Sequence, residues 1–333
     1  MTYQPAKRKS VGFLAGLTGV PGSGKTYTAL LLAAGLAGEK GKVGFIDTEQ
    51  GRGEMYSDSP NIVAAMPDGL YFYKKLLPPF TPEKFIEAIN EAVDFGITAL
   101  VVDSISSEWE GTGGCCEIAE SLKTGWLTVK PRHKKFMPNF ATCCPIPIIF
   151  CLRSADKSDR VETIDKNGKK EVAFVSRGVQ PIQEKNFMFF MTLHLDFTNK
   201  NPGYATVEKC PEPLEPLFSD KKARIGKSIG EKIREWINGG ERIDVQLVKI
   251  ESQLRTAADM GTATLESRHA TLKEFNGDLL KKIWTEEFAR EMKSNAKAAD
   301  NINEIEVEKS SATEESSEAI NEAQKKLFGE KNG

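Results

Sequence analysis

Short apolar runs along this chain alternate with segments of helical period. Four such runs, rich in β-branched residues, span residues 11–17, 42–47, 97–103 and 145–152. Apolar runs of this length are typical of strands that are buried on both faces of a parallel sheet. Between them, residues 27–37 and 82–95 have the composition or spacing of helices. The alternation predicts an α/β fold with a doubly wound, mostly parallel sheet.

Strand signals dominate the stretch that follows. Residues 160–177 predict a hairpin that turns at Asn167-Gly168, and residues 189–197 and 204–209 predict two more strands. We expect these segments to add antiparallel strands at the edge of the sheet. A short helix over residues 229–237 would close the domain before Gly239-Gly240.

Length and composition divide the chain into four regions. Its 333 residues can hold one large domain and a small one. We expect a flexible basic arm over residues 1–10, an α/β domain over residues 11–240, a small helical region over residues 241–294, and a disordered acidic tail over residues 295–333.

Charge and cysteine content exclude several classes of protein. The formal net charge is −2, so any nucleic-acid site has to come from a local basic patch. No apolar run approaches the length of a membrane span, and the N-terminus lacks the apolar core of a signal peptide. From this we expect a cytoplasmic protein without membrane contacts. The six cysteines form no C-x-x-C pair and there are three histidines, so we expect reduced thiols and no zinc site.

A glycine-rich stretch after the first predicted strand fits the pattern G-x-x-x-x-G-K-[ST] at every fixed position. Glycines let such a loop turn its backbone N–H groups inward around phosphate, and the following helix adds its positive dipole end. Lys25 would reach the β- and γ-phosphates, and the Thr26 hydroxyl would bind Mg²⁺. The sequence therefore predicts a site for ATP and Mg²⁺. The loop residues expected to contact the nucleotide are Gly19, Val20, Pro21, Gly22, Ser23, Gly24, Lys25, Thr26 and Tyr27.

Acidic residues follow two of the other predicted strands. The run over residues 97–103 ends in Asp103, as a Walker B strand does, and its carboxylate would hold Mg²⁺ through water. Asp47 and Glu49 follow the strand over residues 42–47. Ligands bind beyond the carboxyl ends of parallel strands, so both acids are placed to face a nucleotide.

These motifs resemble those of the RecA-like branch of the P-loop ATPases. The resemblance to RecA itself is local, and is carried by the phosphate loop and by residues 45–49 and 101–104. The chain also resembles, more loosely and over residues 11–240, shortened RecA-like ATPases that phages encode and that are implicated in single-strand annealing and recombination. That second resemblance includes residues 47–53, 103–111, 130–133 and 152–154. It implies a RecA-like core and, for a phage protein, the host cytoplasm.

The resemblance also implies roles for individual residues. Glu49 would polarise the attacking water, and Tyr56 would stack near adenine. Arg153 stands near the position of the polar residue that senses the γ-phosphate, whereas Gly53 replaces an acid that contacts adenine. With Lys25 and Asp103, Glu49 and Arg153 complete the expected catalytic set. RecA-like sites usually lie between subunits, so the resemblance implies a ring or filament in which a neighbouring copy supplies a further Arg or Lys.

Basic residues after the Walker B strand suggest contact with single-stranded DNA. Lys130, Arg132, Lys134 and Lys135 lie close together with Trp126 nearby, and we interpret this stretch as a loop that neutralises phosphates and stacks on bases. A solvated charged face is the alternative interpretation. A second stretch, residues 153–177, holds nearly as many acids as bases and is the weaker candidate.

The resulting hypothesis is an ATP-hydrolysing protein that acts on single-stranded DNA in recombination, annealing or replication. Two alternatives stay open: a nucleotide-dependent switch or loader that recruits a replication protein with little hydrolysis, and a small-molecule kinase. Near the C-terminus, Gln324, Leu327 and Phe328 have the spacing Q-x-x-L-F, which resembles the peptide by which bacterial replication proteins bind the sliding clamp. A short amphipathic helix that folds back on the protein is the other interpretation of these residues.

Overall fold

The computed structural model describes residues 13–143, 145–164, 170–220, 224–240 and 245–301. Contacts divide the chain into two compact units, Met1–Ile243 and Asp244–Gly333, which are described separately below. The expected basic arm and the Q-x-x-L-F residues lie outside the described residues.

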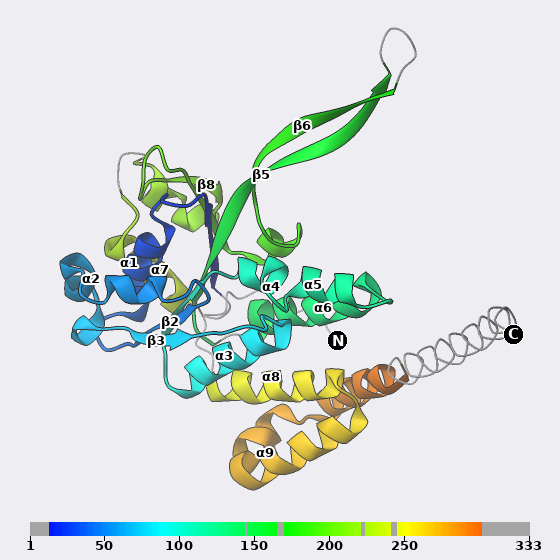
Figure 1. Ribbon diagram of the computed structural model, residues 1–333. Coiled ribbons are helices and arrows are strands. Elements are labelled where there is room, and N and C mark those ends of the chain that lie inside the picture. Colours follow the sequence, from blue (N-terminus) through cyan, green and yellow to red (C-terminus); the bar gives the residue numbers. More distant parts are fainter. Residues whose placement is uncertain (1–12, 144, 165–169, 221–223, 241–244, 302–333) are drawn as a thin grey trace, which may run out of the picture. The chain divides into compact units, whose positions relative to one another are not determined.

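The first unit is built on one large sheet with the strand order β3-β2-β4-β5-β1-β7-β8 (Figure 1). Neighbours from β3 to β7 are parallel, whereas β8 pairs antiparallel with β7 at the edge. The predicted α/β class, a mostly parallel sheet with antiparallel edge strands, is confirmed. The strands are β1 (Leu14–Gly19), β2 (Val43–Asp47), β3 (Phe72–Lys75), β4 (Ala99–Asp103), β5 (Ile148–Ile164), β6 (Lys170–Pro181), β7 (Leu193–Phe197) and β8 (Ala205–Lys209).

Helices cover both faces of this sheet, so that successive residues of a strand are buried in cores on opposite faces. In β4, Val101 joins a core with α1 and α7, whereas Val102 joins a core with α3 and with Phe136 of α6. The strands therefore read as continuous apolar runs because both faces are buried. The helices of this unit are α1 (Lys25–Ala37), α2 (Pro60–Ala65), α3 (Pro82–Asp94), α4 (Ser106–Glu110), α5 (Cys115–Ser121), α6 (Trp126–Cys143) and α7 (Lys227–Asn238), with short 3₁₀ turns η1 (Arg52–Tyr56), η2 (Pro67–Gly69), η3 (Phe187–Phe190) and η4 (Glu212–Phe218).

Strand register brings the predicted motif residues to one edge of the sheet. Asp47 at the end of β2 pairs with Asp103 at the end of β4, and Gly19 at the end of β1 pairs with Arg153 of β5. Because β5 lies between β4 and β1, Arg153 stands between the Walker B strand and the phosphate loop. The sequence alone does not reveal this strand order.

The stretch that holds Trp126 and the basic residues 130–135, interpreted from sequence as a DNA-binding loop, lies instead in a run of helices. This run consists of α4, α5 and α6, and its glycines fall between the helices. Trp126, Val129, His133 and Phe136 follow a 3-4-3 spacing along one side of α6, which is a helical period that the charged residues between them obscured.

The predicted hairpin is present but is longer than expected. β5 runs without a break for 17 residues, from the sheet into an antiparallel ribbon with β6 (Figure 1). The expected turn at Asn167-Gly168 lies outside the described residues. A register shift between Asp156 and Ser158 marks the region where β5 leaves the large sheet.

The described residues of the second unit, 245–301, are mostly helical. The unit contains α8 (Val245–Asp259), α9 (Thr262–Ile283) and a further helix over residues 286–301. Leu254, Leu272 and Ala296 are buried in its core. The disordered tail was expected from residue 295, and that boundary is too early, because Ala296 packs in the core and the helix continues to residue 301. Among the described residues, none of the helices is long and apolar enough to cross a membrane.

Candidate nucleotide-binding site and a neighbouring pocket

The phosphate loop has the backbone that its glycines predict. Gly22 and Gly24 adopt left-handed φ values of 77° and 88°. A Cβ atom on Gly24 would lie 2.9 Å from the backbone nitrogen of Gly203, in the turn between β7 and β8. Gly203 N also donates to Ser23 O at 3.2 Å. This turn, which sequence reasoning did not connect with the site, therefore supports the loop at close range.

Lys25 lies over the loop, and none of its hydrogen bonds within the described part of the chain is to a carboxylate. Its ammonium donates to Gly19 O at 2.7 Å, to Val20 O at 3.0 Å and to Ser23 Oγ at 3.4 Å. Burial lowers the pKa of Lys25, and the nearby Asp103 and Glu49 partly offset this. A half-buried cation that is bonded to uncharged atoms only is suited to receiving an anion.

Thr26 and Asp103 meet across the site. The Thr26 hydroxyl donates to Asp103 Oδ2 at 2.5 Å, so the first turn of α1 touches the end of β4. Burial raises the pKa of the Asp103 carboxyl to about 6, and the charge of Glu49 adds to the increase, whereas the Thr26 hydrogen bond and Lys25 oppose it. The peptide bond between Asp103 and Ser104 is cis. A hydroxyl beside a carboxylate is the ligand pair expected for Mg²⁺ at a phosphate loop.

Asp47 does not face the nucleotide side of the edge but holds the loop that follows β2. Its side chain is fully buried and accepts from the backbone nitrogens of Glu49, Gly51 and Gly53, and from Tyr73 Oη at 2.8 Å. Thr48, the next residue, is bonded to the backbone of Ser104. These contacts position Glu49, so the aspartate two residues before it is a structural support.

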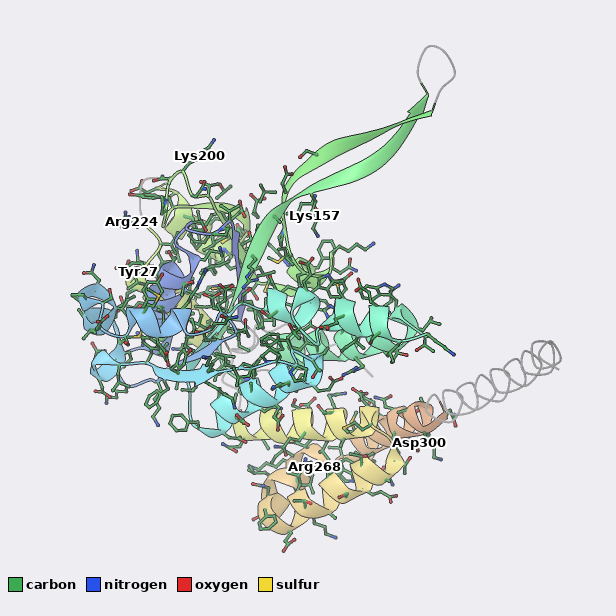
Figure 2. The ribbon with its side chains drawn as sticks, in the orientation of Figure 1. Tyr27, Lys157, Lys200, Arg224, Arg268 and Asp300 are labelled. Atoms are coloured by element: carbon green, nitrogen blue, oxygen red, sulfur yellow. The ribbon has the colours of Figure 1, made fainter. Side chains whose placement is uncertain are left out.

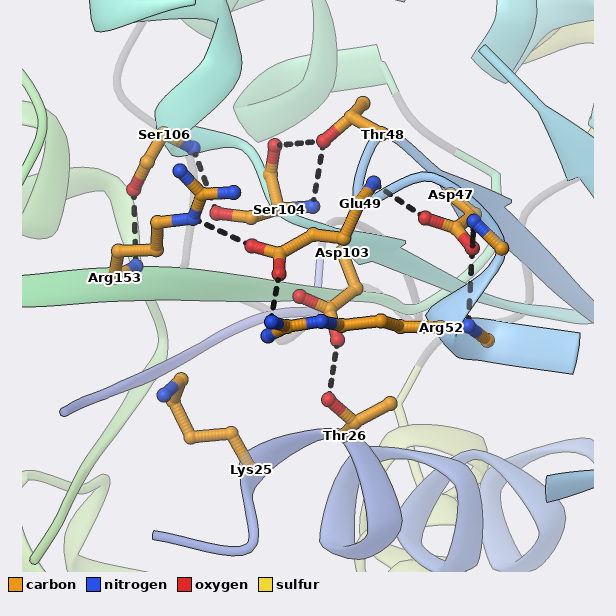
Figure 3. A network of polar contacts seen from close by, with 12 residues as sticks. Lys25, Thr26, Asp47, Thr48, Glu49, Arg52, Asp103, Ser104, Ser106 and Arg153 are labelled. Atoms are coloured by element: carbon orange, nitrogen blue, oxygen red, sulfur yellow. Dashed lines mark hydrogen bonds and ion pairs between the residues drawn. The ribbon is translucent and has the colours of Figure 1, made fainter. Parts of the chain in front are cut away.

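Glu49 lies between two arginines at the mouth of the site (Figure 3). Its Oε1 accepts from Arg153 Nε at 2.5 Å and its Oε2 accepts from Arg52 at 3.2 Å. Only 12 % of the Glu49 side chain is exposed, against 51 % for Arg153. Figure 3 also shows Asp103 between Thr26 and Glu49. The residues that the sequence motifs single out therefore lie together at this edge of the sheet: Lys25, Thr26, Glu49, Asp103 and Arg153.

Tyr56 lies on η1 beside the start of α1. Its ring centroid is 6.1 Å from that of Tyr27, and burial raises its pKa. Gly53, where the RecA family has an acid, packs so closely on Phe45 that a Cβ atom would lie 2.4 Å from that ring. Any larger residue at position 53 would therefore have to displace the Phe45 ring.

A pocket of about 890 Å³ opens beside the nucleotide site. Trp109 of α4 and Trp126 of α6 form part of its wall, with stacked rings whose centroids are 5.3 Å apart. Figure 2 shows Lys157 where the β5–β6 ribbon leaves the sheet. Four lysines line the pocket against one acid, Glu184, and the complete lining is Trp109, Trp126, Val129, Lys130, His133, Lys134, Lys157, Gln183, Glu184, Lys185, Asn186, Phe187 and Phe190.

The pocket changes the set of candidate DNA contacts. Lys130 and Lys134 line it, as the DNA hypothesis requires. Arg132 does not, because it makes a two-point contact with Glu83 of α3 at 2.7 and 2.6 Å. The side chain of Lys135 lies outside the described part of the chain. Lys157 and Lys185 line the pocket instead, and no local sequence pattern groups them with α6.

A buried polar cluster lies behind the pocket wall. Glu108 is fully buried and accepts from His133 Nδ1 at 2.9 Å, from Cys115 Sγ at 3.1 Å and from Gln183 Nε2 at 3.1 Å. The Glu108, Cys115 and His133 ligand atoms lie within 4.8 Å of one another, a spacing that could hold a metal ion. Burial and the charge of Glu108 raise the pKa of Cys115, so its thiol is held protonated as a hydrogen-bond donor.

Comparisons with known proteins place this site in a family. No curated protein matches the chain. Among solved structures, a KaiC-like protein from the hyperthermophilic archaeon Pyrococcus horikoshii OT3 is similar, with 16% sequence identity and a TM-score of 0.36 over 61% of this chain and 81% of that one. Residues 14–183, just over half of the chain, match the AAA_24 family, described as an AAA domain. With its phosphate loop and Walker B strand inside that match, the chain belongs to the AAA_24 family of AAA domains.

Proposed function

We propose that the chain binds Mg·ATP at the phosphate loop and hydrolyses it. The observation that carries this proposal is the convergence of Lys25, Thr26 and Asp103 with Glu49, an acid that is placed to act on water. Phosphoryl transfer needs positioning and charge stabilisation more than covalent chemistry, and these residues supply both.

Each residue has a definite task in this proposal. The loop amides and Lys25 bind the phosphates, and Thr26 and Asp103 would hold Mg²⁺, which neutralises phosphate charge when bound. Glu49 orients a water molecule and accepts its proton as the water oxygen bonds to the γ-phosphorus, while the bond from that phosphorus to the β–γ bridging oxygen breaks and ADP leaves. Arg153 reaches from the next strand toward the same point and exchanges its contact with Glu49 for one with the γ-phosphate.

Release of inorganic phosphate from ATP is the direct test. Lys25→Ala should abolish turnover and weaken ATP binding, because it removes the cation that faces the β- and γ-phosphates. Lys40→Ala, an exposed lysine just after α1, is the matched control and should behave like the parent. Normal turnover in Lys25→Ala would overturn the proposal.

The same assay separates the two other functions. A nucleotide-dependent switch would bind ATP tightly and release almost no phosphate. A small-molecule kinase would transfer phosphate to a metabolite in preference to water. The position of Glu49 favours attack by water, because only 12 % of its side chain is exposed and two arginines fix its carboxylate.

We further propose that the pocket beside the site binds single-stranded DNA. Stacked Trp109 and Trp126 offer aromatic faces, and Lys130, Lys134, Lys157 and Lys185 supply positive charge around them. Groups of this kind bind single strands with little sequence preference, because every base can stack and every phosphate is anionic. A role in recombination, annealing or replication would follow from this contact and from the resemblance to phage ATPases.

Binding of fluorescent oligo(dT) at several salt concentrations tests the DNA proposal. Changing the four pocket lysines to glutamine should weaken binding, and each lost phosphate contact should flatten the slope of log K against log salt by about 0.7. A control with four exposed lysines of the second unit changed (Lys273, Lys281, Lys282 and Lys293) should leave both quantities unchanged. An unchanged slope in the pocket variant would remove the pocket from consideration.

Assembly is the remaining part of the proposal. RecA-like sites are completed by a neighbouring copy, so we propose a ring or filament that forms with ATP. Light scattering with a non-hydrolysable ATP analogue measures this, and a particle that stays monomeric while it hydrolyses ATP would contradict it.

Binding of the C-terminal Q-x-x-L-F residues to a sliding clamp is a separate proposal, tested by pull-down with and without residues 322–333.

A further inference from the structure

α4 is the element that the nucleotide site and the pocket share. This helix of five residues follows the Walker B strand directly. Ser106 Oγ accepts from the backbone nitrogen of Arg153 at 3.0 Å, and Ser107 Oγ lies 2.8 Å from Thr48 Oγ1, next to Glu49. Trp109, two residues on, belongs to the pocket wall. Consecutive residues of one short helix thus touch both places.

Glu108, between Ser107 and Trp109, fixes the position of this helix. A fully buried carboxylate is costly unless donors satisfy it. Its three donors come from three different segments: Cys115 from α5, His133 from α6, and Gln183 from the segment after β6. Gln183 Nε2 also lies 3.2 Å from Ile105 O, at the start of α4. None of the hydrogen bonds or ion pairs found for Glu108 among the described residues involves lysine or arginine, so it depends on these donors.

Two of those three donors also line the pocket. His133 and Gln183 contribute to its wall, and the His133 ring packs edge-on against Trp109 with centroids 5.1 Å apart. A ligand that stacks in the pocket therefore touches the groups that hold Glu108. A second connection runs through the backbone, because Ile182 N donates to Arg153 O at 2.7 Å.

From this juxtaposition we propose that Glu108 is a positioning residue that couples the pocket to the ATP site. The proposal rests on the proposed function, since it assumes that the pocket binds single-stranded DNA and that the phosphate loop binds ATP. DNA that shifts His133 and Gln183 moves α4 through Glu108. The movement of α4 changes the Ser107–Thr48 contact and the placement of Glu49 and Arg153.

The mutual effect of the two ligands on each other's affinity is the measurement that distinguishes a coupling residue from a merely structural one. If the two sites are coupled, an ATP analogue changes the Kd of oligo(dT) by some factor, and oligo(dT) changes the Kd of the analogue by the same factor. Couplings of this kind are typically about 5- to 150-fold. The oligo(dT) Kd is measured with and without the non-hydrolysable analogue, and phosphate release is measured with and without oligo(dT).

Glu108→Gln is the principal variant, because it keeps the size of the side chain but replaces one carboxylate oxygen with an NH₂ group, which only donates. The side chain can then no longer accept from both His133 and Gln183. We expect it to bind oligo(dT) and the analogue separately within about threefold of the parent, while the coupling factor falls to about 1 and DNA stimulation is lost. Glu110 is an exposed acid on the same helix, so Glu110→Gln is the matched control and should keep the coupling factor and the DNA stimulation of the parent.

A second variant covers the case in which Glu108→Gln does not fold. Cys115→Ala removes one donor and leaves His133 and Gln183 in place, so we expect a smaller coupling factor, and Cys115→Ser should restore it. A parent that does not bind oligo(dT) would overturn the DNA part of the proposed function. A parent that binds and is coupled, with coupling undiminished in Glu108→Gln or in Cys115→Ala, would overturn the role of Glu108 alone.

Discussion

Arg153 Nε lies 2.5 Å from Glu49 Oε1, although 104 residues separate the two in the chain. The contact exists because β5 lies between the Walker B strand and the phosphate-loop strand, so that Arg153, level with the last residue of β1, faces the loop after β2. In the proposed ATP site, this ion pair would hold Glu49 in place and give Arg153 a partner until nucleotide binds.

Glu49→Gln should leave ATP binding largely intact and reduce turnover by about two orders of magnitude or more. The amide keeps the size of the carboxylate but cannot accept a proton from water. Removing a group that takes part in proton transfer usually slows turnover by about this factor. Two measurements on one preparation check this prediction: binding of a fluorescent ATP analogue tests ATP affinity, and phosphate release tests turnover. Turnover like that of the parent would show that another acid activates water.

Arg153→Lys should lower turnover by about tenfold or more and affect ATP binding less. Lysine keeps the positive charge but cannot contact Glu49 and a phosphate oxygen with the planar geometry of a guanidinium. Glu49→Gln and the double variant complete a double-mutant cycle with Arg153→Lys. If the two residues act together, the double variant should lose less turnover than the sum of the two single losses, expressed as free energies. Arg268→Lys, at an exposed arginine of the second unit, is the control. Strictly additive losses would mean that the pair seen here has no role in turnover.

The nucleotide site was predictable from sequence because its parts are local motifs. The glycine loop, Asp103 at a strand end, and Glu49 two residues after Asp47 are read within short windows. Strand order then brings them together, and parallel strands place their carboxyl ends on one edge by geometry. What the motifs do not specify is the partner of each side chain. The burial of Asp47 and the pairing of Arg153 with Glu49 depend on register between strands far apart in the chain.

The pocket was less predictable, for a similar physical reason. Lys157 and Lys185 reach it from β5 and from the segment after β6, so no window of the sequence contains the set. The sequence pattern groups the basic residues of α6 as one loop, but a helix turns its side chains to different sides. Lys130 and Lys134, four residues apart, share a side, whereas Arg132 between them faces α3.

Arg132→Gln should therefore leave oligo(dT) binding and its salt slope unchanged, in contrast to Lys134→Gln. Arg132 is held by Glu83, and this contact raises the pKa of the guanidinium, with burial opposing the increase. The pair is partly exposed, so its loss should cost the folded protein less than about 1 kcal/mol. Anisotropy titrations and urea unfolding of the two variants check both expectations. A flattened salt slope in Arg132→Gln would mean that the Glu83 contact breaks when DNA binds.

Asp103→Asn should abolish Mg²⁺-dependent turnover yet stabilise the nucleotide-free protein at pH 7.5. Burial raises the pKa of this carboxyl to about 6 in the folded state, above its ordinary value of about 4 in the unfolded chain. The folded state therefore binds the proton more tightly, and the parent loses stability as the pH rises through this window, by about 1–3 kcal/mol in total. Asparagine carries no such charge.

The stabilisation by Asp103→Asn should accordingly be largest above pH 6 and shrink as the pH falls, because the parent carboxyl is protonated first in the folded state, below about pH 6, and in the unfolded chain only below about pH 4. Urea unfolding of parent and variant at pH 4.5 and 7.5, without nucleotide, gives the four free energies required. Saturating Mg·ATP should reverse the order at pH 7.5, because the parent alone gains the binding energy of a metal held by a carboxylate. A variant that is less stable than the parent at pH 7.5 without nucleotide would mean that the Asp103 carboxylate, despite its burial, is stabilised by its neighbours Thr26 and Lys25.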